Sequence, residues 1–209
     1  MASSTHKLCA ATAVIALVWS TAMNAQDQED EPLPILLDAE SSSFDQKNET
    51  VVFRRLSITQ GNIGISADEA VATALDFERS EWSFTGNVRI TIESATIQAD
   101  SAELVFQDHG LVVAELRGEP AIFEDLSETR EQPISGSANR LSYDNTTRVL
   151  QMNEGARLAE GSNEMTGCNL IYDLEQEKIT SGSSGCDEQV VITIVPPSAE
   201  SEPESTASP

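Results

Sequence analysis

The chain has 209 residues, of which 35 are acidic and 12 are basic, so its formal net charge is −23 at pH 7. This balance excludes a nucleic-acid partner, because a polyanion is bound through Lys and Arg side chains that release its counterions. The sequence shows no nucleophile elbow, no phosphate-binding glycine loop and no histidine-rich metal spacing. His109 lies in a predicted turn without positioning partners, so we expect it to be a solvated polar residue. We therefore predict no enzymatic activity, no cofactor and no metal.

Residues 1–25 have the order of a secretory signal peptide. Lys7 precedes an apolar run from Leu8 to Trp19, and small residues follow, so we expect cleavage after Ala22 or Ala25. The alternative is a retained membrane anchor, since the apolar run can be extended to about 18 residues, the lower limit for a membrane span.

The rest of the chain divides by composition into three parts. Residues 26–34 form an acidic, proline-containing linker, and residues 196–209 form an acidic tail rich in Pro and Ser, which we expect to be disordered. Residues 35–195 between them are long enough for one sizeable domain.

A short motif recurs five times in this domain and predicts a β-repeat protein. It begins with an apolar residue and has a small residue at its third position; it occupies residues 37–40, 65–68, 97–100, 134–137 and, in a weaker form, 165–168. The intervals of 28 to 37 residues are typical of stacked units in which each repeat is one or two β-hairpins.

Strict alternation of apolar and polar residues over 88–93 and 63–66, and nearly so over 190–195, predicts strands that are covered on one side. Residues 68–77 have helical composition, but their place after a repeat motif favours a strand. Six segments rich in Gly, Asn or Asp are predicted turns: 45–48, 85–87, 108–110, 144–145, 153–155 and 181–185.

Aromatic residues are few, at 5% of the chain, and several stand at fixed distances from the motifs. Phe44 and Tyr172 lie seven residues after a motif begins, as do Leu104 and Leu141, whereas Phe106 and Tyr143 lie nine residues after. We expect these side chains to line one interior column, in a core too poor in aromatic rings to fill itself.

Cys168 and Cys186 would remain after signal-peptide cleavage. In an exported protein we expect them to form a disulfide; the alternative is a pair of reduced thiols. Their spacing and the absence of a neighbouring histidine argue against a metal site.

Several segments resemble the OstA-like family of lipopolysaccharide-transport proteins. The run 84–91 leading to 97–100 looks like the family's strand pair, and so does 58–68. Residues 118–123 followed by 134–143 are similar to its later units in order and spacing. The resemblance covers roughly residues 37–183, and the chain is most similar to the soluble periplasmic bridge protein of that family.

The resemblance implies an all-β, antiparallel, folded-over β-jellyroll built from stacked hairpins, with an apolar groove open along one side. It implies a non-enzymatic carrier in the periplasm of a Gram-negative bacterium that moves lipopolysaccharide, acyl chains inside, from the inner to the outer membrane. The implied partners are lipopolysaccharide or lipid A, an inner-membrane anchored homologue, an outer-membrane translocon and other copies of the chain, stacked head to tail.

The resemblance also implies which side chains face the lipid. Positions matching Phe123 and Tyr143 do so, and an apolar pair in the first strand faces both lipid and partner; this pair is either Ile35 and Leu37 or, if an extra N-terminal unit is present, Ile63 and Ile65. Together with the alternation pattern, this predicts a groove lined by Ile35, Leu37, Ile58, Ile63, Ile65, Val88, Ile90, Ile97, Phe106, Leu116, Phe123, Leu141, Tyr143, Met152 and Tyr172.

The acidic tail and the pair Cys168 and Cys186 depart from the family pattern. The strong negative charge disfavours direct binding of lipid A phosphates, so we expect recognition to rest on acyl-chain burial. Alternation places Arg89 and Arg157 on the outward face, whereas Arg54 shares the parity of Leu56 and Ile58 and is the predicted cation at the groove rim. Two alternatives remain: an inner-membrane anchored homologue of the same export system, and a structural β-repeat protein with a sealed core, since groove and core have the same periodicity.

Overall fold

The computed structural model describes residues 33–75, 77–128, 131–181 and 189–196. In these residues eleven strands and no helix are present. The strands are β1 (Leu36–Asp45), β2 (Thr50–Gln60), β3 (Ile63–Ala72), β4 (Arg79–Ile92), β5 (Ala95–Gln107), β6 (Gly110–Asp125), β7 (Ile134–Asp144), β8 (Val149–Glu160), β9 (Asn163–Asp173), β10 (Lys178–Ser181) and β11 (Val191–Thr193). The predicted signal peptide and most of the linker and tail lie outside the described residues, so the predicted domain boundaries stay predictions.

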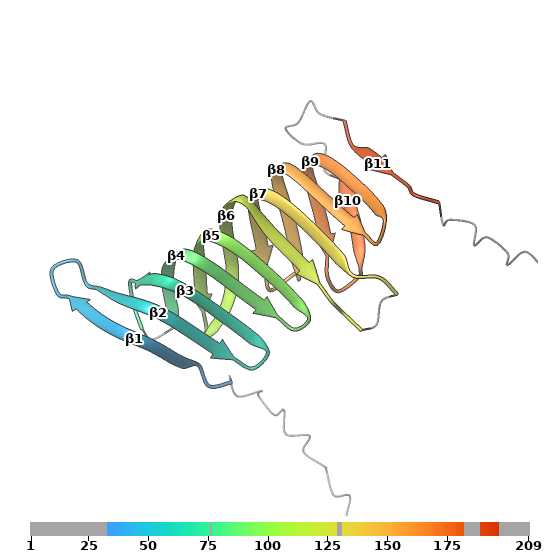
Figure 1. Cartoon of the computed structure of the whole chain (residues 1–209). Coiled ribbons are helices and arrows are strands. Elements are labelled where there is room, and N and C mark those ends of the chain that lie inside the picture. The colour runs from blue at the N-terminus through green and yellow to red at the C-terminus, as the bar shows by residue number, and fades with distance from the viewer. Residues whose placement is uncertain (1–32, 76, 129–130, 182–188, 197–209) are drawn as a thin grey trace, which may run out of the picture. The chain divides into compact units, whose positions relative to one another are not determined.

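One antiparallel sheet contains all the strands, with β1 to β10 side by side in chain order (Figure 1). β11 pairs with β9 beside residues 164–166, and β10 pairs with the same strand beside residues 170–173. Two short strands therefore share the tenth place of the sheet.

The repeat motif marks every second strand. Its five copies lie on β1, β3, β5, β7 and β9, so each repeat is one hairpin, the smaller of the two units that the sequence allowed. The strand expected over residues 68–77 is confirmed up to Ala72, where β3 ends; Phe77, with a positive φ of 54°, belongs to the connection to β4.

Two of the predicted turns are wrong in an informative way. Residues 85–87 lie inside β4 and residues 153–155 inside β8, where Gly86, Asn87, Glu154 and Gly155 all have positive φ. They form β-bulges, because an extra residue with a left-handed conformation bends a strand without ending it. The turns predicted at 45–48, 108–110 and 144–145 do connect strands, and most of 181–185 lies outside the described residues.

The bulges form a line across the middle of the sheet. Register shifts interrupt six neighbouring strand pairs from β3–β4 to β8–β9, and Arg55 of β2 has a positive φ of 46° at the same level. We call the part of the sheet on one side of this line the first wall. It ends at the first rim, which contains the turns 61–62, 93–94 and 161–162 and the connection from the end of β6 to β7, described at 126–128 and 131–133. The part on the other side is the second wall, which ends at the second rim with the connections 46–49, 73–78, 108–109, 145–148 and 174–177.

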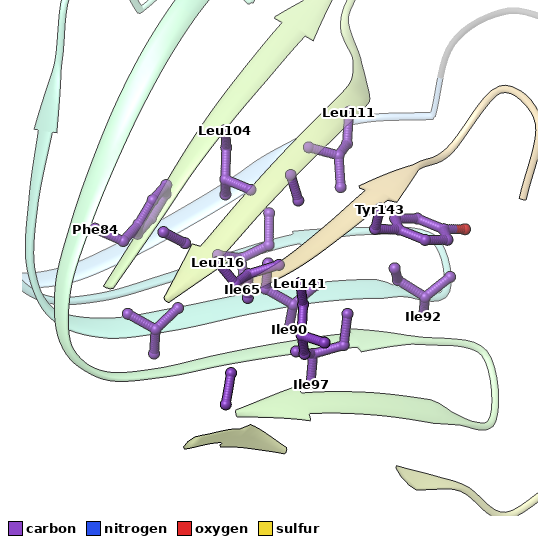
Figure 2. Packing of buried hydrophobic residues seen from close by; sticks show 14 of the residues in the cluster. Ile65, Phe84, Ile90, Ile92, Ile97, Leu104, Leu111, Leu116, Leu141 and Tyr143 are labelled. Carbon is purple, nitrogen blue, oxygen red and sulfur yellow. The ribbon is translucent and has the colours of Figure 1, made fainter. Parts of the chain in front are cut away.

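The sheet folds over along this line, so that the walls face each other. Phe123 of the first wall lies 5.7 Å, between ring centroids, from Tyr172 of the second. Figure 2 shows apolar side chains of both walls, among them Ile90 and Leu104, pointing into the same interior. The predicted fold, an antiparallel folded-over jellyroll, is therefore confirmed.

Candidate functional site

The interior of the folded sheet is the candidate site, and it contains all fifteen predicted groove residues. Twelve of them are no more than 3% exposed, and Ile35, Leu37 and Ile63 are half-buried against the same apolar cluster. The described residues thus place the predicted side chains together, but in a closed interior rather than in an open groove.

Cross-strand register arranges the interior into two apolar ladders, one in each wall. The first ladder contains Leu37, Ile58, Ile65, Ile90, Ile97, Phe123, Gly136, Leu158, Met165 and Ile192, each paired with the next. The second ladder contains Phe44, Val51, Ala72, Trp82, Leu104, Ala114, Tyr143, Leu150, Tyr172 and Ile179. Both run without a break from β1 to the tenth place of the sheet.

The second ladder corrects the column predicted from motif spacing. Phe44, Leu104, Tyr143 and Tyr172 do share it, but two members of the predicted column do not. Leu141 pairs with Leu116 and Met152 in a neighbouring row, and Phe106 pairs with Ser80 and Leu111. On the motif-bearing strands the two ladders are seven residues apart, as from Ile97 to Leu104 and from Gly136 to Tyr143. The copy of the motif on β7 begins at Ile134, two residues before the ladder residue Gly136, so its seventh residue is Leu141 and not Tyr143.

An aromatic cluster fills the interior of the second wall from β2 to β5, which contradicts the expectation of a core too poor in rings to fill itself. Trp82 is fully buried at its centre, with ring-centroid distances of 5.1 Å to Phe77, 5.7 Å to Phe53, 6.0 Å to Phe84 and 6.2 Å to Phe106. We call these five residues the aromatic cluster. Sequence reasoning missed Phe53, Phe77, Trp82 and Phe84 as site residues because they follow no motif at a fixed distance.

A polar cluster joins the two walls further along the sheet. Asp125, 3% exposed at the end of β6, accepts hydrogen bonds from Ser94 Oγ at 2.8 Å, from the Ser127 amide at 3.1 Å and from Tyr172 Oη at 3.1 Å. Ser94, Asp125 and Ser127 belong to the first rim, whereas Tyr172 belongs to the second wall. We call these residues the Asp125 cluster; a buried carboxylate is stable here because its oxygens are hydrogen-bonded.

Two more polar contacts cross between the rims. The Gln60 side-chain amide donates to the carbonyl oxygen of His109 at 2.6 Å, and Arg148 Nη2 lies 3.0 Å from Glu93 Oε2. Within each rim, backbone hydrogen bonds link adjacent connections, for example Glu93 N to Asn62 O at 3.1 Å. The line along which the rims meet, which we call the seam, is thus closed by side chains.

Tyr143 lies beside this seam, in a largely apolar environment. Burial raises the pKa of its phenol, opposed by the positive charge of Arg148. Its hydroxyl lies 3.2 Å from Asn145 Oδ1, and Asn145 Nδ2 donates to the carbonyl oxygen of Leu111 at 3.0 Å. The phenol is therefore neutral at physiological pH and anchored at the second rim.

The parity argument for Arg54 is wrong. The positive φ of Arg55 breaks the alternation, so that Phe53 rather than Arg54 continues the buried set of Leu56 and Ile58. Arg54 is exposed, and its Nη1 lies 3.2 Å from Glu69 Oε2 on the neighbouring strand. The alternation therefore does not support the prediction that Arg54 is a cation at the groove rim. Its role in lipid binding stays a prediction.

The outer face of the sheet is polar. Arg89 and Arg157 are exposed there, as alternation predicted, and Arg157 forms an ion pair with Glu164. Two hollows on this face share Pro120 in their linings. Asn87 and Gln98 line the first hollow, and Arg157 lines the second.

Both edges of the sheet carry exposed apolar side chains. At the first edge Leu36 and Phe44 of β1 are 67% and 60% exposed. At the other edge Ile192 of β11 and the following Ile194 are 58% and 72% exposed. Each edge also leaves the outer side of its strand without a neighbour among the described residues, and such edges favour pairing with another strand.

Cys168 is half-buried on β9, whereas Cys186 lies outside the described residues, so their disulfide stays a prediction. In the described part of the chain, no three His, Cys, Asp or Glu side chains are grouped so that they could hold a metal ion. The same residues contain no helix that is long and apolar enough to cross a membrane.

A folded antiparallel sheet with an apolar interior that runs from edge to edge defines the class of protein: an open-ended β-jellyroll. Residues 69–178 match the family model described as the LptA/(LptD N-terminal domain) LPS transport protein, and the chain belongs to this family.

The chain is also similar to one relative in sequence and to one solved structure in fold. The chain is 25% identical over 126 residues to the lipopolysaccharide export system protein LptA of Haemophilus influenzae, covering 59% of this chain and 72% of that protein. Its fold is similar to the crystal structure of LptH, the LptA-homologous periplasmic component of the lipopolysaccharide transport device of Pseudomonas aeruginosa. That match has a TM-score of 0.50 and 18% identity, and it covers 78% of this chain and 96% of LptH.

Proposed function

We propose that this chain is a non-enzymatic periplasmic carrier that holds the acyl chains of lipopolysaccharide between its two walls and passes the lipid from the inner to the outer membrane. The observation that carries the proposal is the pair of unbroken apolar ladders, which offer a continuous path from β1 to the tenth place of the sheet. Membership of a lipopolysaccharide-transport family supports the choice of lipid.

Acyl chains reach this path when the seam parts. Its closing contacts are hydrogen bonds and one ion pair, which water can replace, whereas the interior that becomes accessible is apolar. Each buried acyl methylene contributes about 0.8 kcal/mol, so a few methylenes offset the loss of these contacts. The net charge of −23 disfavours lipid A phosphates, and recognition rests on acyl burial.

The carrier associates head to tail, strand edge to strand edge, with its own copies, an inner-membrane anchored homologue and an outer-membrane translocon. The register supports this association. β1 of a following copy runs antiparallel to β10 and β11, and pairing Leu37 with Ile192 and Phe44 with Ile179 continues both ladders across the junction. Exposed apolar side chains at both edges would be buried by this pairing.

A photo-crosslinking amino acid at Phe123 or Tyr143 tests the lipid site. These positions face the interior, so we expect lipopolysaccharide adducts in cells and lipid A in mass spectra of the gently purified protein. Ile122, which is 42% exposed on the adjacent position of β6, is the matched control and should give few lipid adducts. Lipid-free preparations without adducts at either interior position would contradict the proposal.

Two other functions keep the same fold. A structural repeat protein with a sealed core is favoured by the low exposure of the interior residues, and it predicts that neither Phe123 nor Tyr143 forms lipid adducts. An inner-membrane anchored homologue would retain residues 1–25, which N-terminal sequencing of the mature chain would detect; a mature N-terminus near residue 23 or 26 supports export by a cleaved signal peptide.

A further inference from the structure

Three polar contacts cross the seam between described residues, and all three follow one rule: each joins a first-rim residue to a second-rim element three strands further along. Gln60, at the β2–β3 turn, reaches His109 at the β5–β6 turn. Glu93, at the β4–β5 turn, reaches Arg148 at the β7–β8 turn. Asp125, at the end of β6, reaches Tyr172 near the end of β9.

The β8–β9 turn, the last turn of the first rim, cannot satisfy this rule within one copy of the chain. Counting three places from the β8–β9 turn, residues 161–162, leads past the tenth place of the sheet. At the other end, the β1–β2 turn, residues 46–49, has no first-rim turn three places before it. Among the described residues, the side chains of Glu160 and Lys47 at these two turns make no contact across the seam.

In a head-to-tail stack, the β8–β9 turn of one copy and the β1–β2 turn of the next copy satisfy the rule as a pair. β1 of the following copy takes the eleventh place and β2 the twelfth, so the count of three from the β8–β9 turn ends at the β1–β2 turn of that copy. We propose that the seam continues across the junction, with Glu160 of one copy contacting Lys47 of a second copy of this chain; this inference rests on the proposed head-to-tail association.

The chemistry of the two turns is complementary. Glu160 has the same place as Gln60: each is the last strand residue before a glycine of positive φ, 57° at Gly161 and 58° at Gly61. Gln60 crosses the seam as a hydrogen-bond donor, whereas the carboxylate of Glu160 requires a donor or a cation. Lys47 is the one basic residue in residues 45–50, and it is exposed.

The β1–β2 turn is held in place before any partner binds. Asp45 Oδ1 accepts the amide hydrogens of Lys47 at 2.9 Å and Asn48 at 3.2 Å, and Asn48 Nδ2 donates to Asp45 Oδ2 at 2.7 Å. Pre-organised contacts lose less conformational entropy on association than flexible ones. The turn therefore presents Lys47 at a fixed place on the second rim.

Charge reversal in the full chain tests the contact by sedimentation equilibrium at low salt. We expect Lys47→Glu and Glu160→Lys each to raise the dissociation constant of self-association about fivefold, the upper range for an exposed ion pair. The double variant Lys47→Glu/Glu160→Lys should recover most of the affinity. Arg89→Glu makes the same change in net charge on the outer face and should have a much smaller effect.

A photo-crosslinking residue at Ser162 gives an independent measurement, and we expect its adducts to map to residues 45–50 of another copy. Equal weakening by Lys47→Glu and Arg89→Glu without recovery in the double variant overturns the seam contact, while association of the unaltered chain leaves the proposed function intact. A chain that stays monomeric at all concentrations overturns the association and with it this inference.

Discussion

The aromatic cluster and the Asp125 cluster both close the interior, but they do so in different ways. The aromatic cluster lies within the second wall, where its rings stack on one another. The Asp125 cluster joins the two rims, since its carboxylate binds Ser94 of one rim and Tyr172 of the opposite wall. The first holds a wall together, and the second holds the walls to each other.

This difference separates folding from opening. When the walls part, the aromatic cluster can move as one unit with its wall, whereas the hydrogen bond between Tyr172 and Asp125 must break. Variants of the aromatic cluster should therefore lower the free energy of unfolding, and variants of the seam should increase the rate of lipid uptake.

The largest effect is expected at the centre of the aromatic cluster. Trp82→Ala removes a fully buried ring that contacts four other rings, and we expect a loss of about 3–5 kcal/mol in the free energy of unfolding. Denaturant unfolding measures it, with Phe44→Ala, a 60% exposed ring of the same ladder, as the control. Equal losses for the two variants would show that the cluster does not stabilise the wall.

Asp125→Ala should have an intermediate effect on stability and a larger one on opening. It leaves the hydroxyls of Tyr172 and Ser94 without this acceptor, which costs about 1–3 kcal/mol for buried polar groups. Because the lost contact with Tyr172 joins the two walls, uptake of fluorescent lipopolysaccharide should become faster, whereas Trp82→Ala should not accelerate uptake at matched stability. Slower uptake by Asp125→Ala would contradict the seam as the route of access.

Much of this arrangement could be predicted from the sequence. The family resemblance and the alternation of apolar residues together predicted fifteen groove residues, and all fifteen lie in or against the apolar interior, because period two determines which side of a strand faces it. The residue pairs between neighbouring strands could not be predicted from the sequence, because each bulge shifts the register by an amount that its local sequence does not specify. Glycine with a positive φ, as at Gly86 and Gly155, occurs in bulges as well as in turns. The prediction therefore placed turns at positions where the strand bends but continues.

The seam itself had no sequence signal. Asp125 and Tyr172 are 47 residues apart in sequence, and they meet only because the sheet folds along the line of bulges. Arg54 shows the same limit at one residue: a single left-handed conformation at Arg55 reversed the face that alternation had assigned to it. Local patterns predict faces, whereas contacts between walls depend on the summed geometry of many strands.

A smaller effect is expected from the ion pair that crosses the seam. Glu93 and Arg148 are half-exposed, so Glu93→Gln should cost about 0.2–1 kcal/mol, and less at high salt. Glu69→Gln removes the pair with Arg54 between neighbouring strands and is the matched control. Both variants should lower stability similarly, but only Glu93→Gln should accelerate lipid uptake. Equal uptake rates for the two variants would show that the Glu93–Arg148 pair does not hold the seam closed.

The smallest effect at neutral pH is expected at Tyr143, and it appears only in alkali. Burial raises the pKa of this phenol, so the folded chain keeps the proton to a higher pH than the unfolded chain, whose tyrosines titrate near 10.0. Stability should therefore fall as the pH rises from that value towards the raised pKa of the folded state, because the unfolded state loses its proton first.

Tyr143→Phe should remove this part of the alkaline loss of stability while changing stability little at pH 7, where only the hydroxyl contact with Asn145 is lost. Denaturant unfolding at a series of pH values measures the slope, and the ultraviolet absorbance of the phenolate measures the pKa directly. A phenol that titrates at its ordinary value would mean that water reaches the interior beside Arg148 in the resting protein. The seam would then be open beside Tyr143 before any lipid binds, and its polar contacts there would not close the interior.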